Sequence, residues 1–211
     1  ATCIAVGLRW QAPEGTEASP YVLRGSGSTL KAPDGHPVAK VIGDQILRVE
    51  NGQWLRFEEL GFDGNRATRV PAEIPAHSLL LMSSRDVFGK GVTSINAVSD
   101  GIYVSSSDGP SADSRPQRIH FEDTIVRNAY RNNISVINAV GFRISGDGKG
   151  KDSSCQLTDA NGTQPEAGID FEPNAGNFAP GITDVVVEGC YIAKNLGTAI
   201  LLHTQADPDG A

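Results

Sequence analysis

Two carboxylates occupy alternate positions in the segment PEAGIDFEPN, residues 165–174. Asp170 lies between the apolar residues Ile169 and Phe171, and Glu172 follows directly. Residues two apart on a β-strand share a face and begin ~6.6 Å from each other. A carboxyl pair at that separation can divide the roles of proton donor and base, because mutual repulsion raises the pKa of one member. Whether this pair does so depends on where the fold directs the two side chains.

A repeated pattern of apolar residues places these acids in a larger architecture. The segments DGIYVSS, NNISVIN, AGIDFEP and TAILLHT each show period-two alternation, the pattern of a strand with one buried face. We expect the inward residues of these segments, and of two earlier ones, to stack from coil to coil. The predicted inward pairs are Leu47/Val49, Leu80/Met82, Ile102/Val104, Ile134/Val136, Ile169/Phe171 and Ile200/Leu202.

A second set of segments, LRFEELGF, VFGKGVTS, IHFEDTIV and VVVEGCYI, lies between the first ones. The spacing from one set to the next is constant. Fifteen residues separate Val87 from Ile102, Ile119 from Ile134, and Val185 from Ile200. Extra residues fall in particular turns, such as DGKGKDSS at 147–154, and a solenoid tolerates insertions of that kind.

These strand pairs, together with LRGSGSTL, LGFDGNR and NAVSDGIYV, resemble a right-handed parallel β-helix of the pectin-lyase-like superfamily. The resemblance runs from about Tyr21 to the end of the sequence. It implies an all-β, single-stranded solenoid of roughly six to seven coils, with residues 1–211 in one domain and an irregular N-terminal part. Because the superfamily includes lyases, hydrolases, epimerases and non-catalytic phage fibres, the fold does not decide the chemistry.

Composition agrees with this fold class and narrows the choice of partner. The 24 Gly, 12 Pro and 6% aromatic residues are typical of a turn-rich all-β protein. A formal net charge of -7 argues against nucleic acid as the partner, since phosphate binding requires a basic face. We expect no membrane-spanning segment, because no apolar run reaches ~18 residues.

Three cysteines, Cys3, Cys155 and Cys190, lack the spacing of a zinc site. Cys155 and Cys190 each precede a first-set strand in successive coils. A disulfide between them is one interpretation, and we favour the other, two small buried residues with free thiols.

The predicted register directs Asp170 and Glu172 away from the core. The first outward row would be Arg48, Leu81, Tyr103, Ser135, Asp170 and Leu201, and the second Glu50, Ser83, Ser105, Ile137, Glu172 and His203. We therefore predict Asp170 and Glu172 as a catalytic acid/base pair, without assigning the roles. The predicted substrate-binding residues are His203, Tyr103, Arg48 and Glu166, the last in the enlarged loop before Asp170, and no metal ligand is assigned. Asp100, at a turn entering a strand, is expected to be structural.

Several interpretations of this cluster stay open. In glycoside hydrolases two carboxyl groups stand ~6.5–9.5 Å apart in inverting enzymes and ~5–5.5 Å apart in retaining ones, and a spacing of two along a strand suits the inverting geometry. Pectate lyases of the resembled superfamily bind calcium through acids on this kind of strand. They also need an Arg or Lys base, which Lys90, Arg127, Arg131 or Arg143 could supply only by reaching in from elsewhere on the coils.

Two further interpretations are weaker on this sequence. Uronate epimerases carry an Asp-Pro-His-Asp-like strand, and IDFEPN lacks its histidine. The acids can also be solvated residues of an exposed face, with Pro173 and Asn174 ending the strand.

The leading prediction is a secreted glycoside hydrolase, extracellular or periplasmic, that cleaves a polysaccharide or oligosaccharide lying on the first sheet. It requires no cofactor, with Ca²⁺ as an option. The alternatives are a polysaccharide lyase or uronate epimerase, and a non-catalytic glycan-binding β-helix such as a phage fibre or adhesin. A hydrolase should have groove walls formed by the insertions Gly146–Ser154 and Gly162–Gly168.

The C-terminal end of the predicted solenoid lacks a cap. After Leu202 only HTQADPDGA follows, which is too short to cover an apolar coil and its free strand edge. We expect that the chain is a fragment, or that another segment or subunit covers this end.

Overall fold

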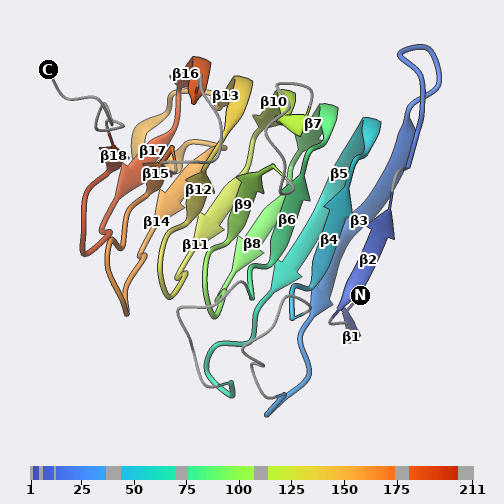
Figure 1. The fold of residues 1–211 in the computed structure, drawn as a ribbon. Coiled ribbons are helices and arrows are strands. Elements are labelled where there is room, and N and C mark those ends of the chain that lie inside the picture. Colours follow the sequence, from blue (N-terminus) through green and yellow to red (C-terminus); the bar gives the residue numbers. More distant parts are fainter. Residues whose placement is uncertain are drawn as a thin grey trace, which may run out of the picture.

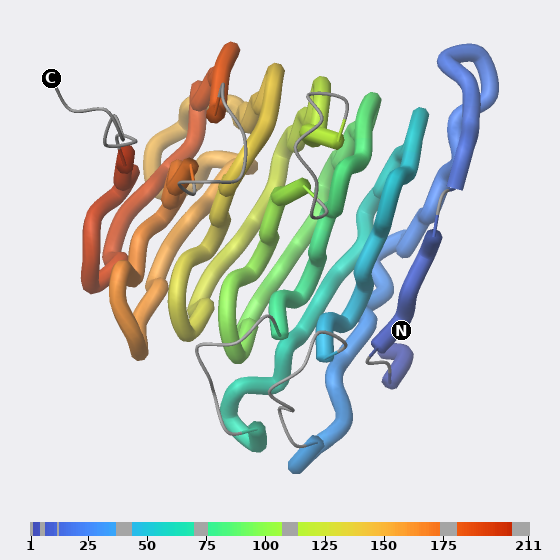
Figure 2. Tube along the Cα trace, viewed as in Figure 1, coloured from blue at the N-terminus to red at the C-terminus, as the bar shows by residue number. Residues whose placement is uncertain are grey.

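The computed structural model describes residues 2–4, 7–11, 13–36, 44–69, 76–106, 114–173 and 181–203. Within these ranges nearly all regular structure is β-structure, and a short 3₁₀ turn, η2, spans Gly150–Asp152. Every strand pairing in the described part is parallel, as Figure 1 shows, and successive coils stack side by side from the N-terminal to the C-terminal end (Figure 2). The predicted all-β parallel β-helix is confirmed.

A seven-stranded parallel sheet carries the segments of the first set, one strand for each coil. Its strands are β2 (Leu8–Gln11), β4 (Leu47–Glu50), β6 (Leu79–Met82), β9 (Ile102–Ser105), β12 (Ile134–Val136), β15 (Ile169–Phe171) and β18 (Ile200–Leu202).

An eleven-stranded sheet forms the remaining faces, and the long strand β5 (Gln53–Asp63) joins its two limbs. Residues 53–58 of β5 pair with one limb and residues 61–63 with the other. The first limb is β7 (Arg85–Lys90), β10 (Gln117–Glu122), β13 (Ala139–Ser145) and β16 (Ile182–Glu188). The second is β8 (Thr93–Ile95), β11 (Ile125–Arg127), β14 (Gln156–Thr158) and β17 (Tyr191–Ala193). At the N-terminal side, β1 (Thr2–Ile4) pairs with β3 (Tyr21–Lys31), which pairs with β5.

In-register stacking of inward side chains builds the core. Ile134 pairs with Ile102 on one side and Ile169 on the other, and all three are fully buried. Phe57, Phe121 and Phe142 fill the space between the sheets. Full burial of each such side chain contributes ~1.5–3 kcal/mol, so the period-two pattern specifies the register strongly.

One predicted inward pair is wrong by a single residue. Leu47 and Val49 pair with Leu79 and Leu81, so the inward pair of this coil is Leu79/Leu81 rather than Leu80/Met82. The segment SLLLM contains four consecutive apolar residues, and alternation cannot distinguish its faces. The outward row therefore contains Leu80 where Leu81 was predicted, and Met82 stands beside Glu50 where Ser83 was predicted.

Asparagines at one corner form a ladder between coils. The Nδ2 group of Asn96 donates to Asp63 Oδ1 (3.1 Å), that of Asn128 to Asn96 Oδ1 (2.7 Å), and that of Asn161 to Asn128 Oδ1 (3.3 Å). Asn96 and Asn128 have left-handed φ values of 54° and 58°, which asparagine tolerates better than most residues. The turn residues thus satisfy their own polar groups while changing the direction of the chain.

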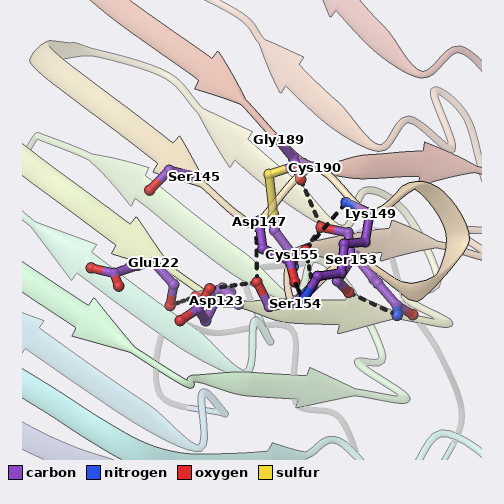
Figure 3. Close-up of a disulfide and its surroundings, with 12 residues drawn as sticks. Glu122, Asp123, Ser145, Asp147, Lys149, Ser153, Ser154, Cys155, Gly189 and Cys190 are labelled. Carbon is purple, nitrogen blue, oxygen red and sulfur yellow. Dashed lines mark hydrogen bonds and ion pairs between the residues drawn. A yellow bond between two sulfur atoms is a disulfide. The ribbon is translucent and has the colours of Figure 1, made fainter.

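The preference for free thiols is wrong: Cys155 and Cys190 form a disulfide (Figure 3). Cys155 directly precedes β14 and Cys190 directly precedes β17, and these strands pair in register. Equivalent positions in adjacent parallel coils lie close enough for a bridge, and here the Cα atoms are 4.6 Å apart. The disulfide therefore ties the last coil to the preceding one.

Apolar side chains lie exposed on the last described coil. Leu202 is 70% exposed, Leu196 72% and Ile200 41%, although Ile200 occupies the position that is buried in Ile169 and Ile134. The predicted covering segment or subunit stays a prediction. In the part of the chain that the structure describes, no helix has the length and apolar character needed to cross a membrane.

Removing the disulfide should destabilise the protein. The cross-link closes a loop of 35 residues, and releasing it gives the unfolded chain more conformational freedom. We expect the double variant Cys155→Ala/Cys190→Ala to lose about 2–4 kcal/mol of unfolding free energy in urea denaturation. The control is Cys3→Ala, which removes an exposed free thiol and should leave the midpoint unchanged. Equal midpoints for the wild type and the double variant would contradict the bridge.

Candidate functional site

Asp170, the middle residue of β15, points away from the core as predicted, but its side chain is covered rather than exposed. It stands in the row of Tyr103 and Ser135, and its side chain is 0% exposed. The Nη2 atom of Arg131 lies 3.8 Å from its Oδ2, and the Nε2 atom of His203 lies 3.2 Å from its Oδ1. The predicted solvent-facing position is therefore wrong, because side chains from the adjoining turns fold over the strand.

Arg131 stands at the centre of three carboxylates. Its turn precedes β12, and its guanidinium reaches Asp100 Oδ2 (3.4 Å) and Glu172 Oε2 (3.1 Å) as well as Asp170. Burial alone lowers the pKa of Arg131, but the three acids together raise it above its usual range. Arg131 therefore stays charged and, from the coil of β12, links an acid of the preceding coil with two acids of the following one.

Asp100 is a buried structural carboxylate with a second role in the cluster. Its Oδ1 accepts the backbone N–H of Asn132 (2.9 Å), as expected for a turn residue. Its Oδ2 faces His77 Nδ1 at 3.3 Å as well as Arg131. Burial raises its pKa, but His77, Arg131 and the Asn132 amide outweigh burial and hold the pKa below the usual value. Asp100 is thus kept ionised.

Asn132 fixes the position of Asp170. Its Nδ2 group donates to Asp170 Oδ2 (2.9 Å) and to Ser135 Oγ (3.1 Å), while its Oδ1 accepts the backbone N–H of Ala167 (2.9 Å). The other oxygen of Asp170, Oδ1, is buried and accepts no hydrogen bond among the described residues. One oxygen is therefore anchored, and the other faces His203.

The environment of Asp170 favours its protonated form. Burial is the largest cause, followed by repulsion from Glu172, while His203 and Arg131 oppose them, and the net effect raises the pKa of Asp170 to about 6. Asp100 and Asp170 thus shift in opposite directions within one cluster. Such a separation of pKa values is how a site assigns acid and base roles to similar groups.

Tyr103 lies beside this cluster and stacks within the protein. Its ring lies 4.0 Å from that of His77 with an interplanar angle of 15°. Burial, and next the charge of Asp100, raise the pKa of the Tyr103 hydroxyl, so it stays protonated. At least one ring face is therefore occupied by His77.

Two other predicted site residues lie outside the cluster. The Oε1 atom of Glu166 accepts the backbone N–H of Gly162 (2.6 Å), which closes its own loop. Arg48 forms an ion pair with Glu50, which also pairs with Arg9. Arg48 stands four coils from Asp170 in the same row, ~19 Å away at the strand spacing, so it could contact only a distant part of an extended ligand.

The two insertions differ in their relation to the acids. The first, Gly146–Ser154, forms hydrogen bonds with Asp123 and Gly189 at the corner where the two limbs of the large sheet meet. The second, Gly162–Gly168, includes Ala167, which is bonded to Asn132 and so borders the cluster. Only the second is placed to form a wall beside Asp170.

Sequence reasoning missed most of the cluster's support. Three of the supporting residues lie in turns, where no alternation of apolar and polar residues indicates which way a side chain points: His77, Asp100 and Asn132. Arg131 was one of four basic residues that the sequence analysis considered as able to reach the acids. Lys90 and Arg143 pair instead with acids of the large sheet. Among the described residues no group of three or more His, Cys, Asp or Glu is arranged to hold a metal ion. The option of Ca²⁺ stays a prediction.

Comparisons with known proteins add support for the fold. No protein-family model matches the chain, and no curated protein matches its sequence. Among solved structures, the chain is similar to a protein of Parabacteroides merdae described as a "putative glycosyl hydrolase", with a TM-score of 0.50 and 13% identity. The match covers 86% of this chain and 77% of that one. At this identity the likeness concerns the fold alone, and membership of the pectin-lyase-like superfamily stays a prediction.

The opposite shifts of Asp170 and Asp100 predict opposite effects of pH on two variants. A raised pKa means that Asp170 stabilises the fold below the unfolded-state pKa and loses this contribution as pH rises through about 6. The unfolding temperature of Asp170→Asn, relative to wild type, should therefore increase from pH 4 to pH 7. For Asp100, whose pKa is lowered, the contribution is lost as pH falls below the usual carboxyl pKa, so the relative stability of Asp100→Asn should increase as pH falls from about 5 to about 2.

Thermal denaturation at several pH values checks both slopes. The control is Asp152→Asn, which alters an exposed side chain in η2, outside the cluster. Parallel slopes for Asp170→Asn and Asp100→Asn would contradict the assignment.

Proposed function

We propose that this protein hydrolyses glycosidic bonds, with Asp170 as the proton donor and Glu172 as the partner carboxylate. The observation that carries the proposal is the pair itself: a buried carboxyl group whose raised pKa favours the proton, two residues from a second carboxylate bound by the same guanidinium. The structural neighbour described as a glycosyl hydrolase agrees with this reaction class. We further propose a secreted enzyme acting on a polysaccharide or oligosaccharide that lies along the seven-stranded sheet.

Each residue of the cluster has a role in such a reaction. Asp170 donates a proton to the glycosidic oxygen through Oδ1, the oxygen without a hydrogen bond. Binding of the sugar displaces the His203 imidazole from this atom. Asn132 holds Oδ2 and so orients the carboxyl group. Glu172 activates a water molecule or attacks the anomeric carbon, and the distance between the two carboxyl groups decides which.

The same nitrogen of Arg131 contacts both acids, at 3.1 and 3.8 Å. The contacted oxygens of Asp170 and Glu172 therefore lie no farther apart than the sum of these distances. This upper limit allows the ~5–5.5 Å separation of retaining enzymes and the lower end of the ~6.5–9.5 Å range of inverting ones. Arg131 also supplies a fixed positive charge beside the acids that needs no reorganisation during the reaction.

A lyase would need a base in this position, and Arg131 is the basic residue that reaches it. The raised pKa of Arg131 opposes that role, since the guanidinium holds its proton more firmly than usual. A second candidate function, glycan binding without cleavage, is favoured by one observation, the complete burial of the Asp170 side chain. Activity measurements distinguish all three.

Substitution of either acid should slow cleavage strongly. General acid–base catalysis contributes about 10²–10⁴-fold, so Asp170→Asn and Glu172→Gln should each lower kcat/KM by that factor. The assay screens a polysaccharide panel for new reducing ends and for the ultraviolet absorbance of an unsaturated product, with Asp152→Asn as the control. New reducing ends without absorbance support hydrolysis. An absorbance rise would indicate a lyase, and full activity in both variants would remove the pair from the mechanism.

The pH profile should report the protonation of Asp170. Because the acid must be protonated, kcat/KM should fall as pH rises above about 6. His203 lowers the pKa of Asp170, so His203→Gln should move this descending limb to higher pH. A limb that stays in place in His203→Gln would show that another group controls it.

A further inference from the structure

A hollow on the large sheet, separate from the acid cluster, combines aromatic and charged side chains. Its volume is about 240 Å³, below the ~300–1,000 Å³ of sites for drug-sized ligands, so it suits a single ring. It lies over β5, β7 and β10. Its lining includes Trp54, Arg56, Asp86, Phe88, Arg118 and His120.

Three side chains of the lining belong to one outward-facing row of the large sheet. Arg56, Phe88 and His120 stand at paired positions on the three strands. The guanidinium of Arg56 lies 5.8 Å from the Phe88 ring centroid, and the His120 ring meets Phe88 edge-on at 5.2 Å. In the described part of the chain, no carboxylate forms an ion pair with Arg56. Its charged group therefore lies beside the Phe88 ring in the lining of the hollow.

The polar side of the hollow is fixed in position. Arg118 binds Asp86 through two parallel hydrogen bonds of 2.5 and 2.7 Å, and its remaining nitrogen contacts Gln117 Oε1 at 3.3 Å. A guanidinium held in this way is oriented before any ligand arrives. Donors and an acceptor thus stand beside the aromatic groups in a defined geometry.

Two bulky residues of this hollow have a left-handed backbone conformation. One row of the large sheet has left-handed φ in five successive coils: Trp54 (55°), Asp86 (55°), Arg118 (53°), Gly141 (75°) and Asp184 (56°). Asp and Gly adopt this conformation readily, whereas a bulky side chain is disfavoured in it. Trp54 and Arg118 are the exceptions in the row, and both line the hollow. Asp or Gly at these two positions would relieve the backbone strain, so the presence of bulky residues there suggests a binding role.

We propose that this hollow binds one sugar ring of a glycan, as a non-catalytic site distinct from the acid cluster. A pyranose presents an apolar C–H face and a rim of hydroxyl groups, which match the aromatic rings and the donors and acceptor beside them. The charged side chains in the lining argue against a lipid chain, and the carboxylates among them, Glu17 and Asp86, disfavour a phosphate ligand. The site does not depend on hydrolysis by Asp170 and Glu172.

Intrinsic fluorescence tests the proposal, since Trp10 and Trp54 are the two tryptophans of the chain. In the Trp10→Phe/Asp170→Asn background Trp54 is the single emitter and the proposed proton donor is absent. The probes are the methyl glycosides of glucose, galactose, mannose, xylose, N-acetylglucosamine and galacturonic acid at millimolar concentration. We expect a saturable change with at least one probe, weakened at least tenfold by Phe88→Ala and by Arg118→Ala.

Two comparisons make the result decisive. Asp152→Asn, in η2 and outside both sites, should leave the response unchanged. Trp54→Asn, whose new residue suits the left-handed conformation, should lose the sugar signal in saturation-transfer NMR; if it does not fold, Arg56→Ala replaces it. No response to any probe, or an equal response in Phe88→Ala, would overturn the site. Because cleavage is measured separately, failure of one proposal leaves the other standing.

Discussion

The parallel backbone ladder between coils is the constraint on which every other feature depends. Ile134 pairs with Ile102 and Ile169, so the residues between them, Ser135, Tyr103 and Asp170, must also stand in one row. A slip of one residue would turn Asp170 into the apolar core and direct Ile169 outward. The cost of burying an unpaired carboxylate among Ile and Phe side chains is far larger than any turn could offset. The register of the strands therefore also determines the geometry of the site.

Charge balance within the cluster follows from that register. Three carboxylates from two coils meet one guanidinium on the coil between them, and removing these groups from water would be unfavourable if all three acids were ionised. The two buried acids, Asp100 and Asp170, receive unequal numbers of hydrogen bonds and charged partners. Asp100 receives a backbone N–H and His77, whereas Asp170 receives a side-chain amide on one oxygen and no hydrogen bond on the other among the described residues. The proton therefore favours Asp170.

The sequence predicts the inward residues correctly where apolar and polar residues alternate strictly, and wrongly where they do not. Ile102, Ile134 and Ile169 were placed correctly, because polar neighbours define their faces. Leu80 was misplaced, since the strand LLLM, residues 79–82, has no polar residue to mark a face. The disulfide was undervalued because an eight-residue insertion obscured the in-register positions of Cys155 and Cys190. The burial of Asp170 could not be foreseen, since it depends on turn residues whose direction no periodicity records.

The shortness of the strands explains how turns come to dominate the chemistry. β15 has three residues, so Asp170 at its centre is one residue from each end. Residues that precede the neighbouring strands, such as Arg131 and Asn132, and residues that follow them, such as His203, all reach the same carboxyl group. On a longer strand the two sets would be too far apart to meet. A solenoid of short strands can therefore assemble a site from both ends of several coils, while its core keeps the simple period of two.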